Sequence, residues 1–160
     1  MSGRFEEALA IEGAQFAELQ PAAFVISVQG AFQRLHPIVY EEILLIAREA
    51  LGNAFQHARA VNIEAEVTYG EEALKIRVRD DGQGIGSEVL ASGRPGHFGL
   101  IGMRERAHKL GAQLAVWSKP GAGTEVELRV PAAVAYPRKS QAPTGIQNWV
   151  AALRATLLRR

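Results

Sequence analysis

The chain has 160 residues, of which 48% are hydrophobic, and its formal net charge is +1. A chain of this size buries ~70% of the surface that its unfolded form exposes, which suffices for one domain with its own core. The balanced charge gives no support for direct nucleic-acid binding, and the absence of cysteine excludes disulfides and thiolate metal sites. No apolar run approaches the ~18 residues of a membrane-spanning helix, so we expect no membrane contact in this chain.

The first third of the chain predicts a helix, a strand and a long second helix. Residues 4–20 carry apolar side chains at helical spacing and predict an amphipathic helix, which Pro21 ends. Residues 24–29 alternate between apolar and polar and predict a strand that ends at Gly30. The next helix begins at Pro37, because proline suits a first helical turn. Its core-facing side carries Val39, Ile43, Ile46, Ala50 and Ala54.

Two hairpins and a further helix are predicted downstream. They are strands at 62–69 and 74–79, a helix at 104–111 and strands at 114–117 and 124–130. Residues 86–98 show no sustained period, and a loop of that length inside a compact domain is either a functional lid or disorder. This order predicts an α+β fold, a two-layer sandwich in which helices cover one face of a mixed, mostly antiparallel sheet.

The last 27 residues predict a linker followed by a short helix. Residues 136–143 are polar and contain two prolines, and Thr144 with Gln147 forms a capping box that begins a helix. We expect the apolar side of this helix to pack on its own domain rather than on another chain. We therefore divide the chain into a linker helix at 1–21, a main domain at 22–133, and a linker with a C-terminal helix at 134–160.

Three polar residues of the long helix form one stripe. Glu49, Asn53 and His57 follow one another at four-residue steps, which drift by only ~40° each around a helix. The stripe borders the apolar side of the helix, where a ligand could be held against the domain. The alternative is an ordinary solvated helix face.

Two glycine-containing segments follow. A lone Asp-Asp-Gly favours a turn, but the second glycine of Asp80–Gly84 would let the backbone approach a flat ligand, and Asp80 could accept a hydrogen bond from an exocyclic amine. The glycines of residues 96–103 run into a helix N-terminus, where amide donors and the helix dipole favour a phosphate chain. A flexible connection is the alternative for this second segment.

Taken in order, these residues resemble the ATP-binding catalytic domain of sensor histidine kinases. This is the GHKL superfamily with the Bergerat fold, which also holds DNA gyrase B, the Hsp90 chaperones and MutL. The resemblance covers about residues 24–131. It rests on four motifs, an N box at Glu49–His57, a G1 box at Asp80–Gly84, a G2 box at Gly96–Met103 and a late Gly123-Thr124. The phrases GHFGLIGMRERAHKLGAQL and GAGTEVELRVP are similar to the subgroup whose response regulators have helix-turn-helix output domains.

The resemblance implies ATP and Mg²⁺ as ligands and a role for each polar residue. Asn53 would ligate the Mg²⁺ that bridges the phosphates, and His57 would approach the phosphate chain. Asp80 would bind the adenine amine directly and through a water that Thr124 shares. Glu49, as the catalytic residue, would orient or deprotonate an attacking group or a metal-bound water.

The resemblance also assigns the glycines of the two boxes to nucleotide binding. Those of the G1 box would make room for the base, and those of the G2 box would let a lid close over the phosphates. With one leucine, the implied binding residues are Gly82, Gly84, Gly96, Gly99, Leu100 and Gly102.

The chain departs from a complete kinase because no histidine fits the phosphoacceptor. That histidine normally stands on a dimerising helical hairpin, followed by an acidic residue, and none of His36, His57, His97 and His108 matches this pattern. We therefore expect the chain to be the catalytic part of a longer, membrane-linked kinase, on its cytoplasmic side. Its partners would be the histidine-bearing dimerisation domain and, through it, a response regulator.

A second function remains open at this point. The same nucleotide pocket could serve a regulatory, partner-switching module that resembles the anti-sigma-factor serine kinases of this superfamily. A histidine-bearing helical hairpin upstream would favour the first function, and a phosphorylated serine on a partner would favour the second.

Overall fold

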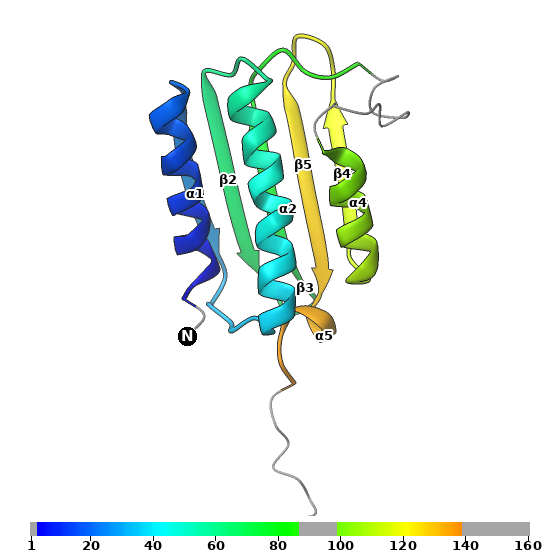
Figure 1. The fold of residues 1–160 in the computed structure, drawn as a ribbon. Helices are drawn as coiled ribbons and strands as arrows, with labels where there is room; N and C mark the ends of the chain where they lie inside the picture. Colours follow the sequence, from blue (N-terminus) through cyan, green and yellow to red (C-terminus); the bar gives the residue numbers. More distant parts are fainter. Residues whose placement is uncertain (1–2, 87–98, 139–160) are drawn as a thin grey trace, which may run out of the picture.

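The computed structural model of the protein describes residues 3–86 and 99–138. Figure 1 shows a single sheet with helices packed against it. In chain order the elements are α1 (Phe5–Leu19), β1 (Ala23–Gln29), α2 (Pro37–Gln56), β2 (Asn62–Tyr69), β3 (Ala73–Asp80), α4 (Leu100–Lys109), β4 (Gln113–Ser118), β5 (Thr124–Pro131) and α5 (Ala132–Ala135). None of the helices in this described part is long and apolar enough to cross a membrane.

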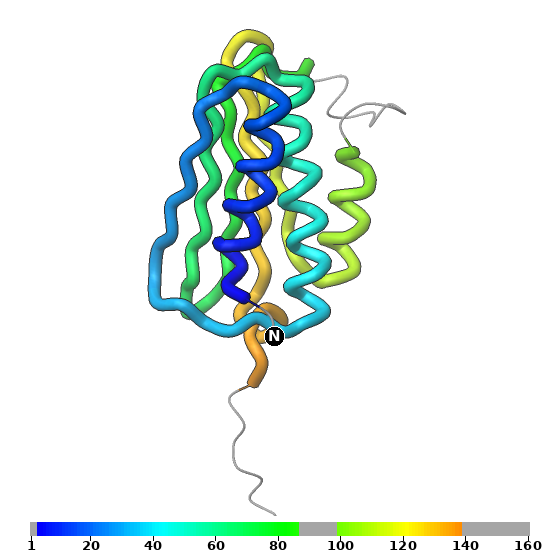
Figure 2. Tube along the Cα trace, turned by 60° about the vertical axis from the view of Figure 1, so that its left-hand side comes forward, coloured from blue at the N-terminus to red at the C-terminus, as the bar shows by residue number. Residues whose placement is uncertain are grey.

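The five strands form one mixed sheet in the order β1-β2-β3-β5-β4. β1 pairs with β2 in parallel, and the other three pairings are antiparallel. Figures 1 and 2 show α1, α2 and α4 on the same face of the sheet, with α2 in the middle. The predicted α+β sandwich with helices on one face is therefore confirmed.

The long helix α2 occupies the centre of the helical layer because its apolar stripe meets the middle of the sheet. Its first turn is defined by Pro37 and by His36, whose ring accepts a hydrogen bond from the N–H of Ile38. The five residues predicted to face the core are all at most 5% exposed. The helix is thereby fixed against the sheet, and the orientation of its polar stripe is fixed with it.

Helix α1 belongs to the same core. Phe5 and Leu9 are fully buried, and the ring of Phe5 meets the ring of Tyr40 on α2 edge-on, at 5.8 Å between centroids. Phe16 stacks on Phe55 near the other end of the two helices, at 5.7 Å. The helix predicted as a linker therefore contributes buried side chains to the domain.

Two details differ from the sequence expectations. Helix α4 begins at Leu100 rather than at residue 104, and Gly99, in a left-handed conformation with φ 58°, precedes it. The alternation over residues 24–29 puts Val28 among the apolar positions of β1, but Val28 is 45% exposed, because it lies near the end of an edge strand that has a neighbour on one side only. The predicted C-terminal helix and most of the predicted loop at 86–98 lie outside the described residues.

The face of the sheet without helices carries matched charges. Glu64 pairs across the strands with Arg79, which pairs with Glu125, and the next row repeats the pattern with Glu66, Arg77 and Glu127. Arg77 forms an ion pair with Glu66 at 3.0 Å. Opposite charges on neighbouring strands stabilise a sheet, and they keep this face hydrated.

Candidate functional site

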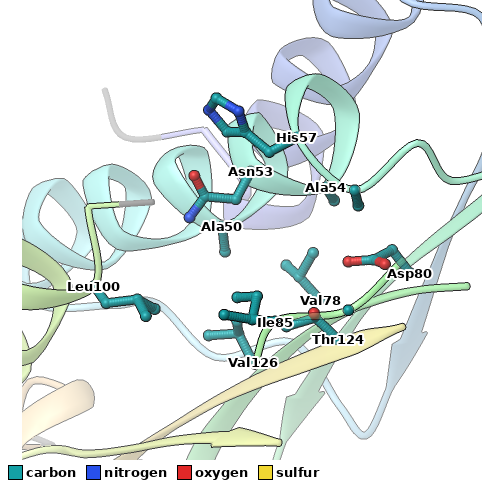
Figure 3. Close-up of a pocket in the computed structure, with 12 residues that line it drawn as sticks. Ala50, Asn53, Ala54, His57, Val78, Asp80, Ile85, Leu100, Thr124 and Val126 are labelled. Atoms are coloured by element: carbon teal, nitrogen blue, oxygen red, sulfur yellow. The ribbon is translucent and has the colours of Figure 1, made fainter. Parts of the chain in front are cut away.

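A narrow cavity lies at one end of the fold, between the C-terminal half of α2, the ends of β3 and β5, and the start of α4 (Figure 3). The empty space in and before it, with open solvent included, is about 420 Å³. Most of the lining is aliphatic, with Asp80 and Thr124 at one end and Asn53 and His57 above (Figure 3). The lining residues are Ala50, Asn53, Ala54, His57, Ala58, Val78, Asp80, Gly84, Ile85, Leu100, Thr124 and Val126. Such a cavity suits a flat, mostly apolar ligand that has a polar edge.

Asp80 ends strand β3 inside this cavity and is 7% exposed, the one buried charged side chain among the described residues. Burial raises the pKa of its carboxyl group, while hydrogen bonds from the backbone N–H groups of Gly82 and Thr124 oppose that rise. The bond from Gly82 to Oδ1 measures 2.9 Å. A carboxylate in an apolar cavity is costly unless it has hydrogen-bond donors, so its remaining acceptor sites favour a ligand that brings N–H groups.

The neighbouring Asp81 has a different, structural role. Its side chain is exposed and accepts hydrogen bonds from the backbone N–H groups of Val61 and Asn62, each at 2.9 Å, and from the side chain of Asn62 at 2.8 Å. These bonds, chiefly those from Asn62, lower the pKa of Asp81. Of the two aspartates in the motif, only Asp80 lines the cavity.

The loop after Asp80 is fixed to backbone on both sides, and its glycines make this possible. A Cβ atom on Gly82 would overlap the carbonyl oxygen of Ala58, and one on Gly84, whose φ is 73°, would overlap that of Lys119. Gln83 donates to the carbonyl oxygens of Ala58 and His57, in each case at 2.7 Å. The two glycines are therefore required by the packing of the chain itself, whatever room they also leave for a ligand.

Ser118, which the sequence interpretation did not single out, holds the other side of the loop. Its Oγ accepts from the N–H of Ile85 at 2.7 Å and donates to the carbonyl oxygen of Gly123 at 2.9 Å. It also lies 2.8 Å from Oγ1 of Thr124, opposite which it stands in the β4–β5 pairing. Two hydroxyl residues flanking one hairpin turn are the signal that could have identified it.

A wider and more polar groove opens beside the cavity, between α2 and α4. Asn53 and His57 line both, so the two spaces share a wall. Glu49, Gly99 and Gly102 line the groove only, together with Arg48 and Arg106. The carboxylate of Glu49 lies so close to Gly99 that any side chain at residue 99 would overlap it.

The structure thus brings together most of the residues predicted for the site. Six of them line the cavity, namely Asn53, His57, Asp80, Gly84, Leu100 and Thr124. Gly82 is buried beside Asp80, to which its N–H donates, and Glu49, Gly99 and Gly102 lie along the adjoining groove. Gly96 lies outside the described residues.

Comparisons with known proteins agree with this geometry. A family model described as histidine kinase-, DNA gyrase B-, and HSP90-like ATPase matches residues 39–134. Sensor protein VraS of Staphylococcus saprophyticus is 33% identical over 95 residues, which are 58% of this chain and 26% of that protein. The nitrate/nitrite sensor protein NarX of Escherichia coli is 37% identical over 84 residues, 52% of this chain and 14% of that protein.

A solved structure has the same fold. The histidine kinase domain of the blue-light activated histidine kinase from Erythrobacter litoralis EL346 superposes with a TM-score of 0.64 and is 25% identical, over 80% of this chain and 65% of that one. This chain spans about a quarter or less of the two curated relatives named above. The family model, however, covers more than half of this chain. The chain therefore belongs to the histidine kinase-, DNA gyrase B- and HSP90-like ATPase family, as an ATP-binding catalytic domain of the sensor histidine kinase type.

Proposed function

We propose that this domain binds Mg-ATP across the cavity and the groove and passes the γ-phosphate to a histidine on a dimerisation domain of the same longer protein. A response regulator with a helix-turn-helix output domain then takes the phosphate from that histidine. The observation that carries the proposal is the buried Asp80 in an aliphatic cavity that shares Asn53 and His57 with a polar groove.

The cavity suits adenine. Aliphatic side chains such as Val78, Ile85 and Val126 offer flat apolar contact to the two faces of the base. The Asp80 carboxylate accepts from the amino group, and Thr124 lies beside it to share a bridging water. Stacking area and one charge-assisted hydrogen bond together give both affinity and orientation.

The groove suits the phosphate chain. The first N–H groups of α4, after Gly99, have no acceptor within the helix, and the positive end of the helix dipole lies there. His57 adds a ring nitrogen to this wall, and Arg48 and Arg106, which form ion pairs with Glu12 and Glu42, line the same groove. Asn53 would supply one amide oxygen to Mg²⁺, an ion that keeps several waters and otherwise binds phosphate oxygens. When bound, Mg²⁺ neutralises charge on the β- and γ-phosphates.

Glu49 would act on the acceptor. It is exposed and lines the groove one turn of α2 before Asn53. A neutral imidazole nitrogen attacks the γ-phosphorus, its bond to phosphorus forms, and the bond from phosphorus to the bridging oxygen of the ADP breaks. Glu49 would orient that imidazole by accepting its other N–H.

We propose that the acceptor histidine lies on another domain, and the histidine at the start of α2 is far from the site. His36 precedes Asn53 by 17 residues, or about 25 Å along a helix that rises ~1.5 Å per residue. Its ring is also engaged with the N–H of Ile38.

We propose that the domain works as the cytoplasmic part of a membrane-linked sensor. The comparisons give no support to the partner-switching alternative.

Calorimetric titration with a non-hydrolysable ATP analogue, with and without Mg²⁺, tests the proposal. Asn53→Ala should remove the dependence on Mg²⁺, and Asp80→Asn should weaken binding whether or not the metal is present. Glu71→Gln, at an exposed turn far from the cavity, is the control and should bind like the unmodified protein. Equal binding by all four proteins would contradict the assignment of the site.

A further inference from the structure

Ser118 joins three parts of the chain that meet at the polar end of the cavity. The loop after β3 donates to it through Ile85, the β4–β5 turn accepts from it through Gly123, and the side chain of Thr124 lies against it. We propose that Ser118 fixes the direction of the hydrogen bonds there, so that Thr124 can only accept, and that it thereby makes the pocket select 6-amino over 6-oxo purines. This inference rests on the proposed binding of ATP.

The number of protons and acceptor sites on the Ser118 hydroxyl fixes the direction of its hydrogen bonds. A serine hydroxyl has one proton and two acceptor sites. The N–H of Ile85 fills one acceptor site at 2.7 Å, and the carbonyl oxygen of Gly123, which can only accept, takes the proton at 2.9 Å. The 2.8 Å contact with Thr124 is then a hydrogen bond only if Thr124 donates to the second acceptor site.

The opposite direction is less favourable. If Ser118 donated to Thr124, its oxygen and that of Gly123 would face each other at 2.9 Å with no proton between them. A part-buried carbonyl oxygen would lose its donor, at a cost comparable to that of a lost hydrogen bond. The network is complete in one direction only.

The consequence appears inside the cavity, which Thr124 lines beside Asp80 (Figure 3). With its proton committed to Ser118, the threonine hydroxyl presents lone pairs, as does the ionised carboxylate of Asp80. A 6-amino group or a bridging water supplies N–H or O–H donors to these acceptors. A 6-oxo group would bring a third acceptor and leave buried polar groups unpaired, which is how binding sites reject close analogues.

Ser118 acts here as a positioning residue, since it is not among the described residues that line the cavity. Replacing it with alanine frees the Thr124 hydroxyl to turn its proton toward the ligand. Ser118 also holds the loop in place, and loss of that support should lower the affinity for every purine nucleotide equally.

The test compares the affinities of ATP and inosine triphosphate, which differ in the group at the 6-position and, with it, in whether N1 carries a proton. We expect Ser118→Ala to narrow the preference for ATP about tenfold, the equivalent of one hydrogen bond. Ser118→Thr, which keeps the hydroxyl, should retain the preference. Ser27→Ala, on the edge strand β1, is the matched control and should also retain it. In a Thr124→Val background, Ser118→Ala should no longer change the ratio.

Two results would overturn the inference. One is an equal loss of affinity for both nucleotides in Ser118→Ala, which would make Ser118 a brace for the loop only. The other is an unchanged ratio in Ser118→Cys, a variant of similar shape whose thiol is a poor donor and acceptor, and which serves if the alanine variant does not fold. Failure of the unmodified protein to bind either nucleotide is a distinct result, which would overturn the proposed function and this inference with it.

Discussion

The folded domain without ligand disfavours the charged form of Asp80, because the carboxyl group is buried in an apolar cavity. Because burial raises its pKa, the folded protein holds a proton on this group more tightly than the unfolded chain does. Stability from this group is therefore fully present below its unfolded pKa of ~4 and is lost as the pH rises through the raised folded value. The charged form of Asp80 is therefore the less favourable one for the stability of the fold.

Nucleotide binding should show the opposite dependence on pH. An ionised Asp80 accepts from the adenine amine, so affinity should fall as the pH is lowered through the raised pKa, above the ordinary value of ~4. Asp80→Asn should lower affinity at pH 7 about 30-fold or more, for a lost charge-assisted bond, while its free energy of unfolding stays equal or rises. Titration calorimetry and urea unfolding between pH 4 and 7 measure both. The asparagine variant also reports the titration of the ligand itself, and a parallel pH profile in the two proteins would contradict the role of Asp80.

The backbone conformation at residue 84 requires a glycine. At φ 73° an alanine costs ~1–3 kcal/mol, and its Cβ would also overlap the carbonyl oxygen of Lys119. Gly84→Ala should destabilise the domain by at least that amount and weaken nucleotide binding. Gly86→Ala, where a Cβ atom meets nothing within 4 Å, should change stability by no more than ~0.5 kcal/mol. Urea unfolding gives the free energy of unfolding of both variants. Similar losses of stability in Gly84→Ala and Gly86→Ala would contradict the explanation based on the φ angle of Gly84.

At the level of the elements, the contact between α1 and β1 rests on a glycine. A Cβ atom on Gly13 would overlap the ring of Phe24, which in turn packs on Phe55 at 5.9 Å. Helix propensity alone predicts that Gly13→Ala stabilises by ~1 kcal/mol, but overpacking of this kind costs ~1–3 kcal/mol, so we expect a net loss.

Two further variants test that explanation by thermal or urea unfolding. In a Phe24→Ala background the cost of Gly13→Ala should disappear, because the ring is gone. Gly102→Ala, at a helical glycine with nothing within 4 Å, should raise stability by ~0.5–1 kcal/mol. A loss at Gly13 that persists without the ring would point to the backbone instead. A real steric contact would also favour counting α1 as part of the catalytic domain rather than as a linker.

The elements also show how far the sequence could predict the site. Helical periodicity set the burial of α2, so the place of Asn53 and His57 on its polar border followed from local pattern alone. The start of α4 did not, because Gly99 caps it without any side-chain hydrogen bond and the first turn contains a second glycine. The two hydroxyl residues at the hairpin turn mark Ser118 in the sequence, but its role could not be derived from that pattern, since it depends on the β4–β5 register and on a loop that is 33 residues away.

For the whole molecule, the four histidines predict inactivity in isolation, because none of them matches the phosphoacceptor pattern. The purified chain should bind ATP but should not incorporate γ-phosphate, since His36 lies at the other end of α2 and the acceptor is proposed to lie on another domain. Incubation with γ-labelled ATP, followed by an acid-stability assay for phosphohistidine, measures this. Label that is lost on replacing one of the four histidines would contradict the prediction.

Both ends of the described chain lie at the pole of the molecule opposite the cavity. Helix α1 begins there and α5 follows β5 there, while the end of β3 and the chain that follows it lie at the other pole (Figure 1). The N–H of His36 donates to the carbonyl oxygen of Ala135 at 2.8 Å, which anchors that end of the fold. A fluorescent protein fused before residue 5 or after residue 138, or a tether to a sensor surface at either place, would therefore leave the nucleotide entrance facing solvent. The domain is in this respect well suited to be built into an ATP biosensor.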